Sequence, residues 1–124
     1  MARSPAYDKF PEHKIRIEPA SGGVRVTWQG QVVAESRRFL LLHEGSYPPA
    51  VYLPREDAKL AFFERSAHTT HCPFKGDAAY FSLHAGSERS DDTVWTYEDP
   101  FDQVAEIRDH LAFYADRVTI ETLP

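Results

Sequence analysis

Apolar residues in this chain occur at every second position, in short runs separated by turn-forming residues. Val24, Val26 and Trp28 alternate with polar residues, and Gln29-Gly30 follows before a second apolar run at 32–34. A two-residue period places alternate side chains on opposite faces of an extended strand. Glycine reaches positive φ at little steric cost, which allows a tight reversal. These residues therefore predict a β-hairpin, and with it a fold made mainly of strands.

Further strand-like segments follow along the chain. Phe39–Leu42 is a continuous apolar run too short for a typical helix, which favours a strand buried on both faces. The segment 78–84 alternates and is predicted to pair with 94–97 across the 86–92 loop. The remaining strand-like segments are 15–17, 51–53, 60–63 and 118–120. The sequence thus predicts a mainly β fold, α+β at most.

One segment, at about 100–114, has the pattern of a helix instead. Asp99 is a good N-cap, and Pro100 is tolerated in the first turn. Apolar side chains then recur at steps of three and four residues, at Val104, Ile107, Leu111 and Tyr114. That spacing places them on one side of a helix. A shorter helical turn is predicted at 54–57, because proline and acidic residues favour a first turn.

Length and composition predict one domain preceded by an arm. A chain of 124 residues with 42% hydrophobic and 13% aromatic residues is sufficient for one packed core and leaves little room for a second. Residues 1–13 are polar and contain Pro5 and Pro11 without strand or helix periodicity, so we expect an arm that is loose or lies against the body. Residues 14–124 are expected to form a single β-rich domain.

Charge, hydropathy and cysteine content exclude several classes of function. The formal charge of −5 provides no general attraction to a phosphate backbone, so no nucleic-acid partner is expected. No apolar run approaches the roughly 20 residues that span a bilayer, and the first residues lack the apolar stretch of a secretory signal. Cys72 is the only cysteine, so no internal disulfide can form, and a reducing cytoplasm is the expected location.

The segment His68–Asp77 carries the greatest variety of reactive side chains. It holds two imidazoles, the single thiol, an amine and a carboxylate. Pro73 and Gly76 predict that 66–77 is a turn-rich loop, and loops held by a rigid sheet often carry binding groups. Three functional interpretations compete with a purely structural one.

Two of these interpretations depend on the single thiol. A metal site would combine the imidazoles of His68 and His71 with the thiolate of Cys72, which are ligands that zinc prefers. The segment lacks a second cysteine and a nearby fourth ligand, so no metal site is predicted. A nucleophilic site would use Cys72 with a thiolate stabilised by His71 or Lys75. The alternative, a cysteine that acts as a small apolar residue, is favoured.

The third interpretation is a pocket for a polar or anionic small molecule. Arg55 and Lys75 would provide positive charge, and the neighbouring aspartates would accept hydrogen bonds. The candidate ligand-binding residues are Arg55, Asp57, His71, Cys72, Lys75, Asp77, Tyr80 and Trp95, with Tyr52 and Tyr97 as further aromatic residues. The structural alternative is that the charges form ion pairs that only fix the loops. No glycine-rich phosphate-binding loop is present, and no cofactor is predicted.

Three runs, Val51–Asp57, His71–Tyr80 and Val94–Tyr97, occur in an order that resembles a known family. On these runs the chain is similar, from about residue 13 to residue 120, to the small bacterial domains of unknown-function family 427. The resemblance implies a β-tent-like fold of two antiparallel sheets, with ligands in a cleft between them. Many relatives of that fold bind zinc through two Cys-x-x-Cys arms, and this sequence has neither arm.

The family is also labelled a nucleotidyltransferase domain. That activity usually requires a Gly-Ser followed by an Asp-x-Asp or Asp-x-Glu pair that holds two metal ions. Gly45-Ser46 and Gly86-Ser87 are present, but neither precedes such a pair at suitable spacing. The resemblance therefore transfers no catalytic residue to this chain.

Small-molecule binding is the preferred hypothesis for function. It requires that Arg55, Lys75 and Asp77 converge on one solvent-accessible hollow beside the 66–77 loop. An enzyme that uses Cys72 or Asp77 in thiol or acid–base chemistry is one alternative, and a structural or interaction domain is another. The sequence determines neither the ligand nor the oligomeric state.

Overall fold

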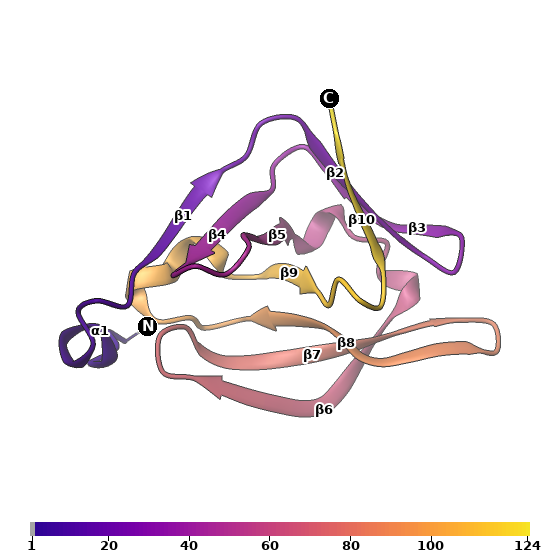
Figure 1. Ribbon diagram of the computed structural model, residues 1–124. Coiled ribbons are helices and arrows are strands. Elements are labelled where there is room, and N and C mark those ends of the chain that lie inside the picture. The colour runs from indigo at the N-terminus through magenta and orange to yellow at the C-terminus, as the bar shows by residue number, and fades with distance from the viewer. Residues whose placement is uncertain (1) are drawn as a thin grey trace.

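The computed structural model describes residues 2–124, so Met1 of the predicted arm lies outside it. Within these residues, ten strands form two sheets in which neighbouring strands are antiparallel. The larger sheet has seven strands in the order β1-β4-β5-β9-β8-β7-β6, and the smaller has three in the order β10-β2-β3 (Figure 1). The prediction of a mainly β fold with two antiparallel sheets is confirmed.

The strands are short, and the helical segments between them are shorter. The strands of the larger sheet are β1 (Ile15–Pro19), β4 (Leu40–Glu44), β5 (Ala50–Pro54), β6 (Phe63–Cys72), β7 (Gly76–Ala85), β8 (Glu88–Tyr97) and β9 (His110–Phe113). Those of the smaller sheet are β2 (Gly23–Trp28), β3 (Gln31–Ser36) and β10 (Thr119–Leu123). The helical segments are α1 (Ala6–Lys9) and the 3₁₀ turns η1 (Arg55–Asp57), η2 (Leu60–Phe62) and η3 (Asp102–Ile107). No helix within residues 2–124 has the length and apolar character needed to cross a membrane.

Both predicted strand pairings are confirmed. Strands β2 and β3 form a hairpin, and its turn at Gln29-Gly30 has φ values of 51° and 72°. Two successive positive φ values match the twist of the strands in a two-residue hairpin. Strands β7 and β8 also pair, with Tyr80 opposite Trp95. The helical turn expected at 54–57 is present as η1.

The helix predicted at about 100–114 is wrong. The 3₁₀ turn η3 ends at Ile107, and Val104 inside it has a non-helical φ of −129°. The chain then reverses at Asp109, whose φ is 55°, and continues as β9 between β5 and β8. Tertiary pairing outweighs the local spacing here, because β9 satisfies backbone groups of two neighbouring strands that would otherwise lack partners.

The loop predicted at 66–77 is also wrong for most of its length. Strand β6 continues to Cys72 and β7 begins at Gly76, so only 73–75 form the turn. Strand β6 lies at the edge of the sheet and its side chains are mostly exposed, so its polar residues resemble those of a loop. The strand predicted at 60–63 is instead the turn η2 followed by the first residue of β6.

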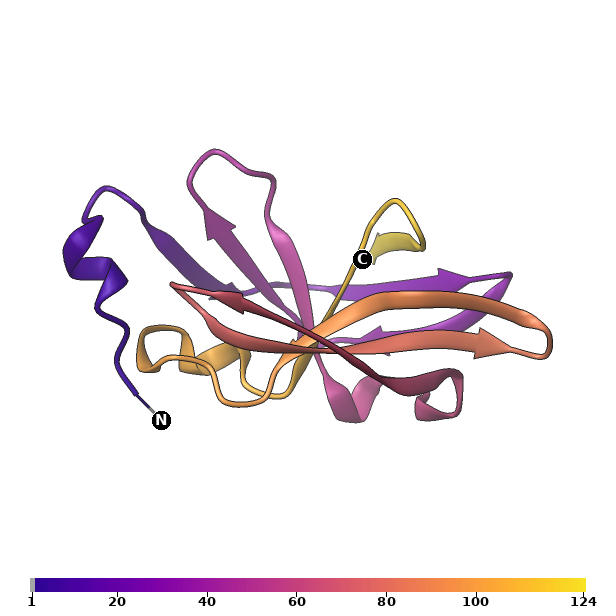
Figure 2. The same ribbon diagram turned by 90° about the horizontal axis from the view of Figure 1, so that it is seen from below.

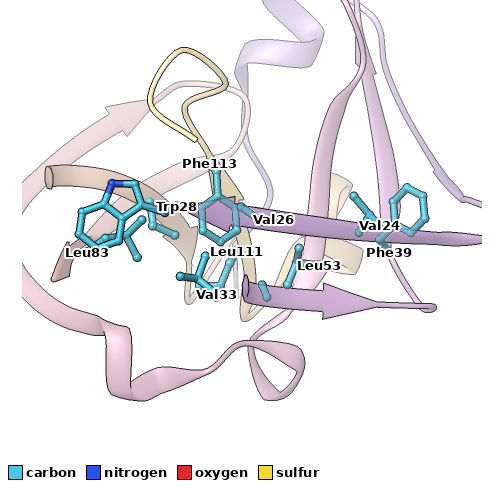
Figure 3. Close-up of a cluster of buried hydrophobic side chains, with 11 residues drawn as sticks. Val24, Val26, Trp28, Val33, Phe39, Leu53, Leu83, Leu111 and Phe113 are labelled. Carbon is cyan, nitrogen blue, oxygen red and sulfur yellow. The ribbon is translucent and has the colours of Figure 1, made fainter. Parts of the chain in front are cut away.

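Two clusters of buried side chains lie on opposite faces of the larger sheet. Leu53 and Leu111 pack with the smaller sheet, whereas their neighbours Tyr52 and Ala112 point the other way. The first cluster, shown in Figure 3, has the buried members Val24, Val26, Trp28, Val33, Ala34, Phe39, Leu53, Leu83, Val94, Leu111 and Phe113. The second has the buried members Leu42, Tyr52, Ala78, Tyr80, Tyr97, Val104, Ile107 and Ala112.

The apolar run at Phe39–Leu42 contributes to both clusters but is less buried than predicted. Phe39 and Leu42 are buried, whereas Leu40 and Leu41 between them keep partial exposure. β4 is the second strand from one edge of the larger sheet, next to the short strand β1, and is therefore near the border of both clusters.

The N-terminal arm lies against the body of the protein, beside the turn between β6 and β7 (Figure 2). Ser4 is fully buried, and its hydroxyl donates a hydrogen bond to the carbonyl of Pro73. The hydroxyl of Tyr7 donates to the carbonyl of Phe74 at 2.7 Å. The arm thus helps to fix the turn from which Lys75 projects.

Candidate functional site

The larger sheet separates the candidate residues between its two faces. Tyr80, Trp95 and Cys72 belong to the second cluster, on the face that we call the aromatic face. Lys75 extends from the β6–β7 turn to Glu44 at the end of β4. The remaining four candidates bind side chains elsewhere: Arg55, Asp57, His71 and Asp77.

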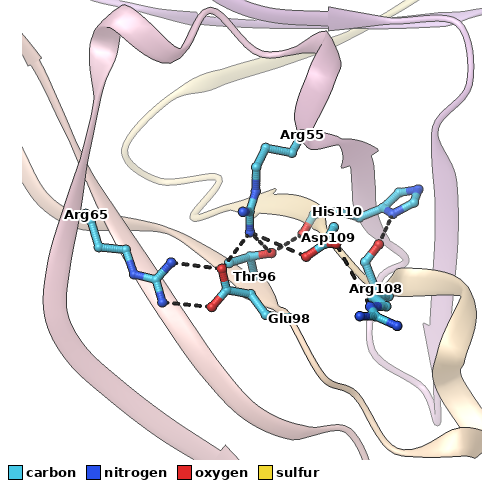
Figure 4. A network of polar contacts seen from close by, with 7 residues as sticks. All are labelled: Arg55, Arg65, Thr96, Glu98, Arg108, Asp109 and His110. Carbon is cyan, nitrogen blue, oxygen red and sulfur yellow. Dashed lines mark hydrogen bonds and ion pairs between the residues drawn. The ribbon is translucent and has the colours of Figure 1, made fainter. Parts of the chain in front are cut away.

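Arg55 is held in a polar network on the opposite face (Figure 4). Its Nη2 lies 3.2 Å from a carboxylate oxygen of Glu98 and 3.3 Å from the hydroxyl of Thr96. Arg65 donates two hydrogen bonds to the Glu98 carboxylate, of 2.8 and 2.7 Å. Hydrogen bonds from Arg65 and then Arg55 lower the pKa of Glu98 and keep it charged. This network joins η1 to β6 and β8, so Arg55 has a structural partner.

Asp57 also joins two elements. Its carboxylate accepts hydrogen bonds from the Ser36 hydroxyl at 2.6 Å and from the Arg38 guanidinium at 3.1 Å. Burial opposes ionisation of Asp57, but the hydrogen bonds from Ser36 and Arg38 outweigh it and lower the pKa of the carboxyl. Asp57 therefore anchors η1 to the end of β3.

His71 and Asp77 face each other across β6 and β7. The Nδ1 of His71 lies 2.7 Å from a carboxylate oxygen of Asp77, and the side chains are 59% and 86% exposed. With Thr69 and Thr70 they line an open hollow of about 370 Å³. A histidine oriented by a carboxylate can act as a general base. Both side chains are exposed to water, however, and water weakens the electrostatic effect of the His71–Asp77 pair on a bound molecule.

Lys75 forms an ion pair with Glu44. Its Nζ lies 2.9 Å from one carboxylate oxygen of Glu44, and the ring of His13 binds the other at 2.8 Å. The side chains of Lys75 and Glu44 are only 14% and 20% exposed. Burial disfavours the ammonium, but Tyr52 and Glu44 outweigh it and raise the pKa of Lys75. Lys75 is therefore a charged group that Glu44 neutralises, and not a nucleophilic amine.

The prediction that Arg55, Lys75 and Asp77 converge on one hollow is wrong. Each forms an ion pair with a partner of its own. Asp77 lines an open hollow with Thr69, Thr70 and His71, and neither Arg55 nor Lys75 is among its lining residues. The physical reason is that Arg55 lies in η1, Lys75 in the β6–β7 turn and Asp77 in β7, so the three side chains start from different elements and meet different partners.

The aromatic face carries a continuous row of aromatic side chains across neighbouring strands. The ring of His68 lies 4.6 Å from that of Tyr80, and the Tyr80 hydroxyl lies 3.5 Å from that of Tyr114. The ring of Tyr114 lies 4.7 Å from that of Trp95. The Trp95 indole donates a hydrogen bond of 3.1 Å to the Tyr52 hydroxyl. We call these five side chains the aromatic row.

The two ends of the aromatic row differ in exposure. Tyr52 and Tyr80 are buried, Trp95 is partly buried, and Tyr114 and His68 are exposed, with 39% exposure for Tyr114. The partly buried apolar residues Ile15, Ile17, Leu40 and Ala50 pack against the same cluster. The row therefore offers both ring surfaces and hydroxyl groups at the protein surface.

Two tyrosine hydroxyls of the row, those of Tyr52 and Tyr114, are held as neutral hydrogen-bonding groups. The hydrogen bond to Tyr80, together with burial, raises the pKa of Tyr114 to about 12. Burial likewise raises the pKa of Tyr52. The Tyr80 hydroxyl also lies 3.0 Å from the hydroxyl of Thr70, so the row extends to the exposed edge strand. At neutral pH these groups can both donate and accept hydrogen bonds.

Sequence reasoning identified part of this row and missed the rest. Tyr80 and Trp95 were candidates, and Tyr52 was a further aromatic residue. The sequence prediction omits Tyr114, because its spacing from Leu111 matches a helical step. His68 is predicted only as a possible metal ligand. Trp95 and Tyr97 occupy alternate positions of β8 and so mark the aromatic face, but no local pattern marks Tyr114 or His68.

The possible metal ligands His68, His71 and Cys72 do not gather in the described part of the chain. Across residues 2–124, no group of three or more histidine, cysteine, aspartate or glutamate side chains is arranged to hold a metal ion. His68 contacts Tyr80, His71 binds Asp77, and Cys72 is a free, partly buried thiol.

Comparison with protein families gives one match that covers most of the chain. The family model matches residues 16–123, and its description is "Domain of unknown function (DUF427)". The arm lies outside the matched range. A comparison with curated proteins gave no match.

Proposed function

The chain belongs to the DUF427 family of domains of unknown function, and we propose that it binds a small molecule containing a planar ring through its aromatic row. One observation carries this proposal: rings from several neighbouring strands form a single connected row in which His68 and Tyr114 are exposed. A partly exposed group of apolar and aromatic side chains with a few convergent polar groups is typical of a ligand site.

The row suits a flat ligand with polar edges. The exposed rings of Tyr114 and His68 and the partly exposed indole of Trp95 can pack against a planar ring, and such contacts contribute about 0.5–1.5 kcal/mol each beyond their buried area. The hydroxyls of Thr70 and Tyr80 can exchange hydrogen bonds with polar atoms at the edge of that ring.

The charges near the row favour a neutral polar ligand over an anionic one. Lys75 and Arg55, the cations expected to attract an anion, are each paired with a glutamate. Arg117 lies 5.6 Å from the centre of the Tyr114 ring, but its guanidinium already donates to the carbonyl of Asp91. We therefore retain the polar part of the hypothesis from the sequence and not the anionic part.

The two tryptophans allow a direct test by NMR, because Trp95 belongs to the row and Trp28 to the core between the sheets. Nicotinamide and adenosine should shift the indole N–H signal of Trp95 in a saturable way and leave that of Trp28 in place. Cyclohexanecarboxamide, which is polar but not aromatic, should have a much smaller effect. Tyr114→Ala should abolish the shift, and because this side chain is exposed the fold should tolerate the change. If no ring compound moves the Trp95 signal at millimolar concentration, or Tyr114→Ala binds equally well, the proposal fails.

Thiol chemistry is the second candidate function, and one observation favours it. Cys72 is a free, partly buried thiol that packs against the aromatic face. Iodoacetamide should then alkylate Cys72 in the folded protein, and mass spectrometry measures the fraction modified. A thiol that reacts only after unfolding in urea would identify Cys72 as a structural residue. A single free cysteine also suits the proposed cytoplasmic location.

A further inference from the structure

A second group of aromatic side chains lies where the arm meets the body of the protein. An open hollow of about 320 Å³ is lined by Phe10, Glu12 and His13 of the arm, Gly45 after β4, and Phe74 of the β6–β7 turn. Figures 1 and 2 show the arm at one end of the molecule, beside these turns. The hollow shares no residue with the aromatic row, so its function is independent of the proposed function.

Phe74 is the centre of this group. The ring of His13 stacks on it at 3.9 Å, and the rings of Tyr7 and Phe10 approach it edge-on at 5.2 and 6.3 Å. The three contacting rings come from arm residues spaced three apart. Phe10 nevertheless keeps 51% of its surface exposed. Core packing therefore does not account for its position, and its ring is available to a bound molecule.

Of the side chains that line the hollow, Glu12 carries a negative charge and His13 is bound to Glu44, whereas Lys9 and Lys14 line the adjoining hollows. Glu12 is exposed and has no ion-pair partner among residues 2–124. The neighbouring Glu44 carboxylate is shared between Lys75 and His13. The chain as a whole carries a formal charge of −5. The one charged group that lines the hollow without a partner is thus a carboxylate, which repels anions and attracts cations.

From these observations we propose that the hollow binds an organic ammonium group, such as the head of a quaternary or alkylated amine. The face of an aromatic ring attracts a cation through its quadrupole, and rings that surround an alkylated ammonium also bury its methyl groups. Phe10 and Phe74 provide the rings, and Glu12 provides the opposite charge. A hollow of about 320 Å³ is sufficient for such a group and small for a larger ligand.

The test compares two probes of nearly equal shape and different charge. The full chain is titrated with choline and, separately, with 3,3-dimethylbutan-1-ol, in which carbon replaces the charged nitrogen. Sodium chloride keeps the ionic strength equal. Choline should shift the backbone amide signals of Phe10, His13 and Gly45 in a saturable way, with an affinity roughly tenfold or more above that of the neutral alcohol.

Two variants separate the contributions of ring and charge. Phe10→Leu keeps apolar volume and removes the ring, and Glu12→Gln keeps shape and removes the charge; each should weaken choline binding severalfold. Glu88→Gln is the matched control, because it removes an exposed carboxylate far along the chain and should leave binding unchanged. Equal affinity for choline and the alcohol overturns the proposal, as does a Glu12→Gln variant that binds like the unaltered chain. Choline-induced shifts at Trp95 instead of Phe10 would also overturn it and would assign the cation to the aromatic row.

Discussion

At the scale of single residues, the partner of each charged side chain decides what else it can bind. Lys75 has the sequence context of a ligand-binding amine, yet Glu44 and His13 complete its environment. Arg55 is similarly paired with Glu98. Both partners lie more than thirty positions away along the chain, so no local pattern could have identified them. The residue types of the candidate site were predictable, and their pairing was not.

The Lys75–Glu44 pair leads to a prediction about stability. Glu44→Gln should lower the free energy of unfolding by about 1–3 kcal/mol, because it leaves a largely buried ammonium without its counter-charge. Glu64→Gln serves as the control, since its pair with Arg89 is exposed and should contribute little. Urea unfolding followed by tryptophan fluorescence measures both variants. Equal midpoints for the two variants would show that the pair has no special role.

At the scale of elements, the turn between β6 and β7 depends on one backbone conformation. Gly76 begins β7 with a φ of 117°, which L-amino acids rarely adopt, and a Cβ there would meet the carbonyl oxygen of Asp99 at 3.4 Å. Without this conformation β6 and β7 could not pair so soon after the proline. The sequence indicated a turn at these residues but overestimated its length, because the polar residues of an edge strand have no buried face to mark them as strand.

Gly76→Ala should therefore destabilise the protein by about 1–3 kcal/mol through backbone strain. Gly86→Ala is the matched control, since Gly86 also has a positive φ, of 60°. This φ lies in the left-handed region that other residues can adopt, and a Cβ at Gly86 would meet nothing within 4 Å. Thermal unfolding of both variants should give the lower midpoint for Gly76→Ala. If Gly86→Ala were equally destabilised, the loss of stability would come from positive φ alone and not from the conformation of the β6–β7 turn.

At the scale of the whole molecule, ion pairs between elements should make the fold sensitive to acid. Hydrogen bonds and charges from basic side chains lower the pKa of six carboxyl groups: Glu18, Glu35, Glu44, Asp57, Glu64 and Glu98. In Glu44 and Asp57 burial opposes this effect and is outweighed. A carboxyl group whose pKa is lower in the folded chain stabilises the fold only while it is ionised.

This stabilisation should be complete above the ordinary pKa values, 4.5 for glutamate and 3.8 for aspartate, and should be lost as the pH falls through the lower folded values. Circular dichroism during acid titration should show no unfolding near pH 6 and progressive unfolding below about pH 4. Glu44→Gln should make the acid transition shallower, since one linked group is removed. A transition centred between pH 5 and 7 would instead show that protonation of histidine side chains, and not of carboxylates, unfolds the protein.

The amino-acid sequence alone determined that this chain forms a mainly β domain, because two-residue alternation and turn residues act locally along each strand. It also determined the β2–β3 hairpin and the β7–β8 pairing, which join neighbouring segments. Only the tertiary structure decided that Leu111 belongs to a strand, that Lys75 binds Glu44, and that Tyr114 completes the aromatic row. The physical reason is that these outcomes depend on contacts between segments far apart in the sequence, and a local sequence pattern does not reflect the free energy of such contacts.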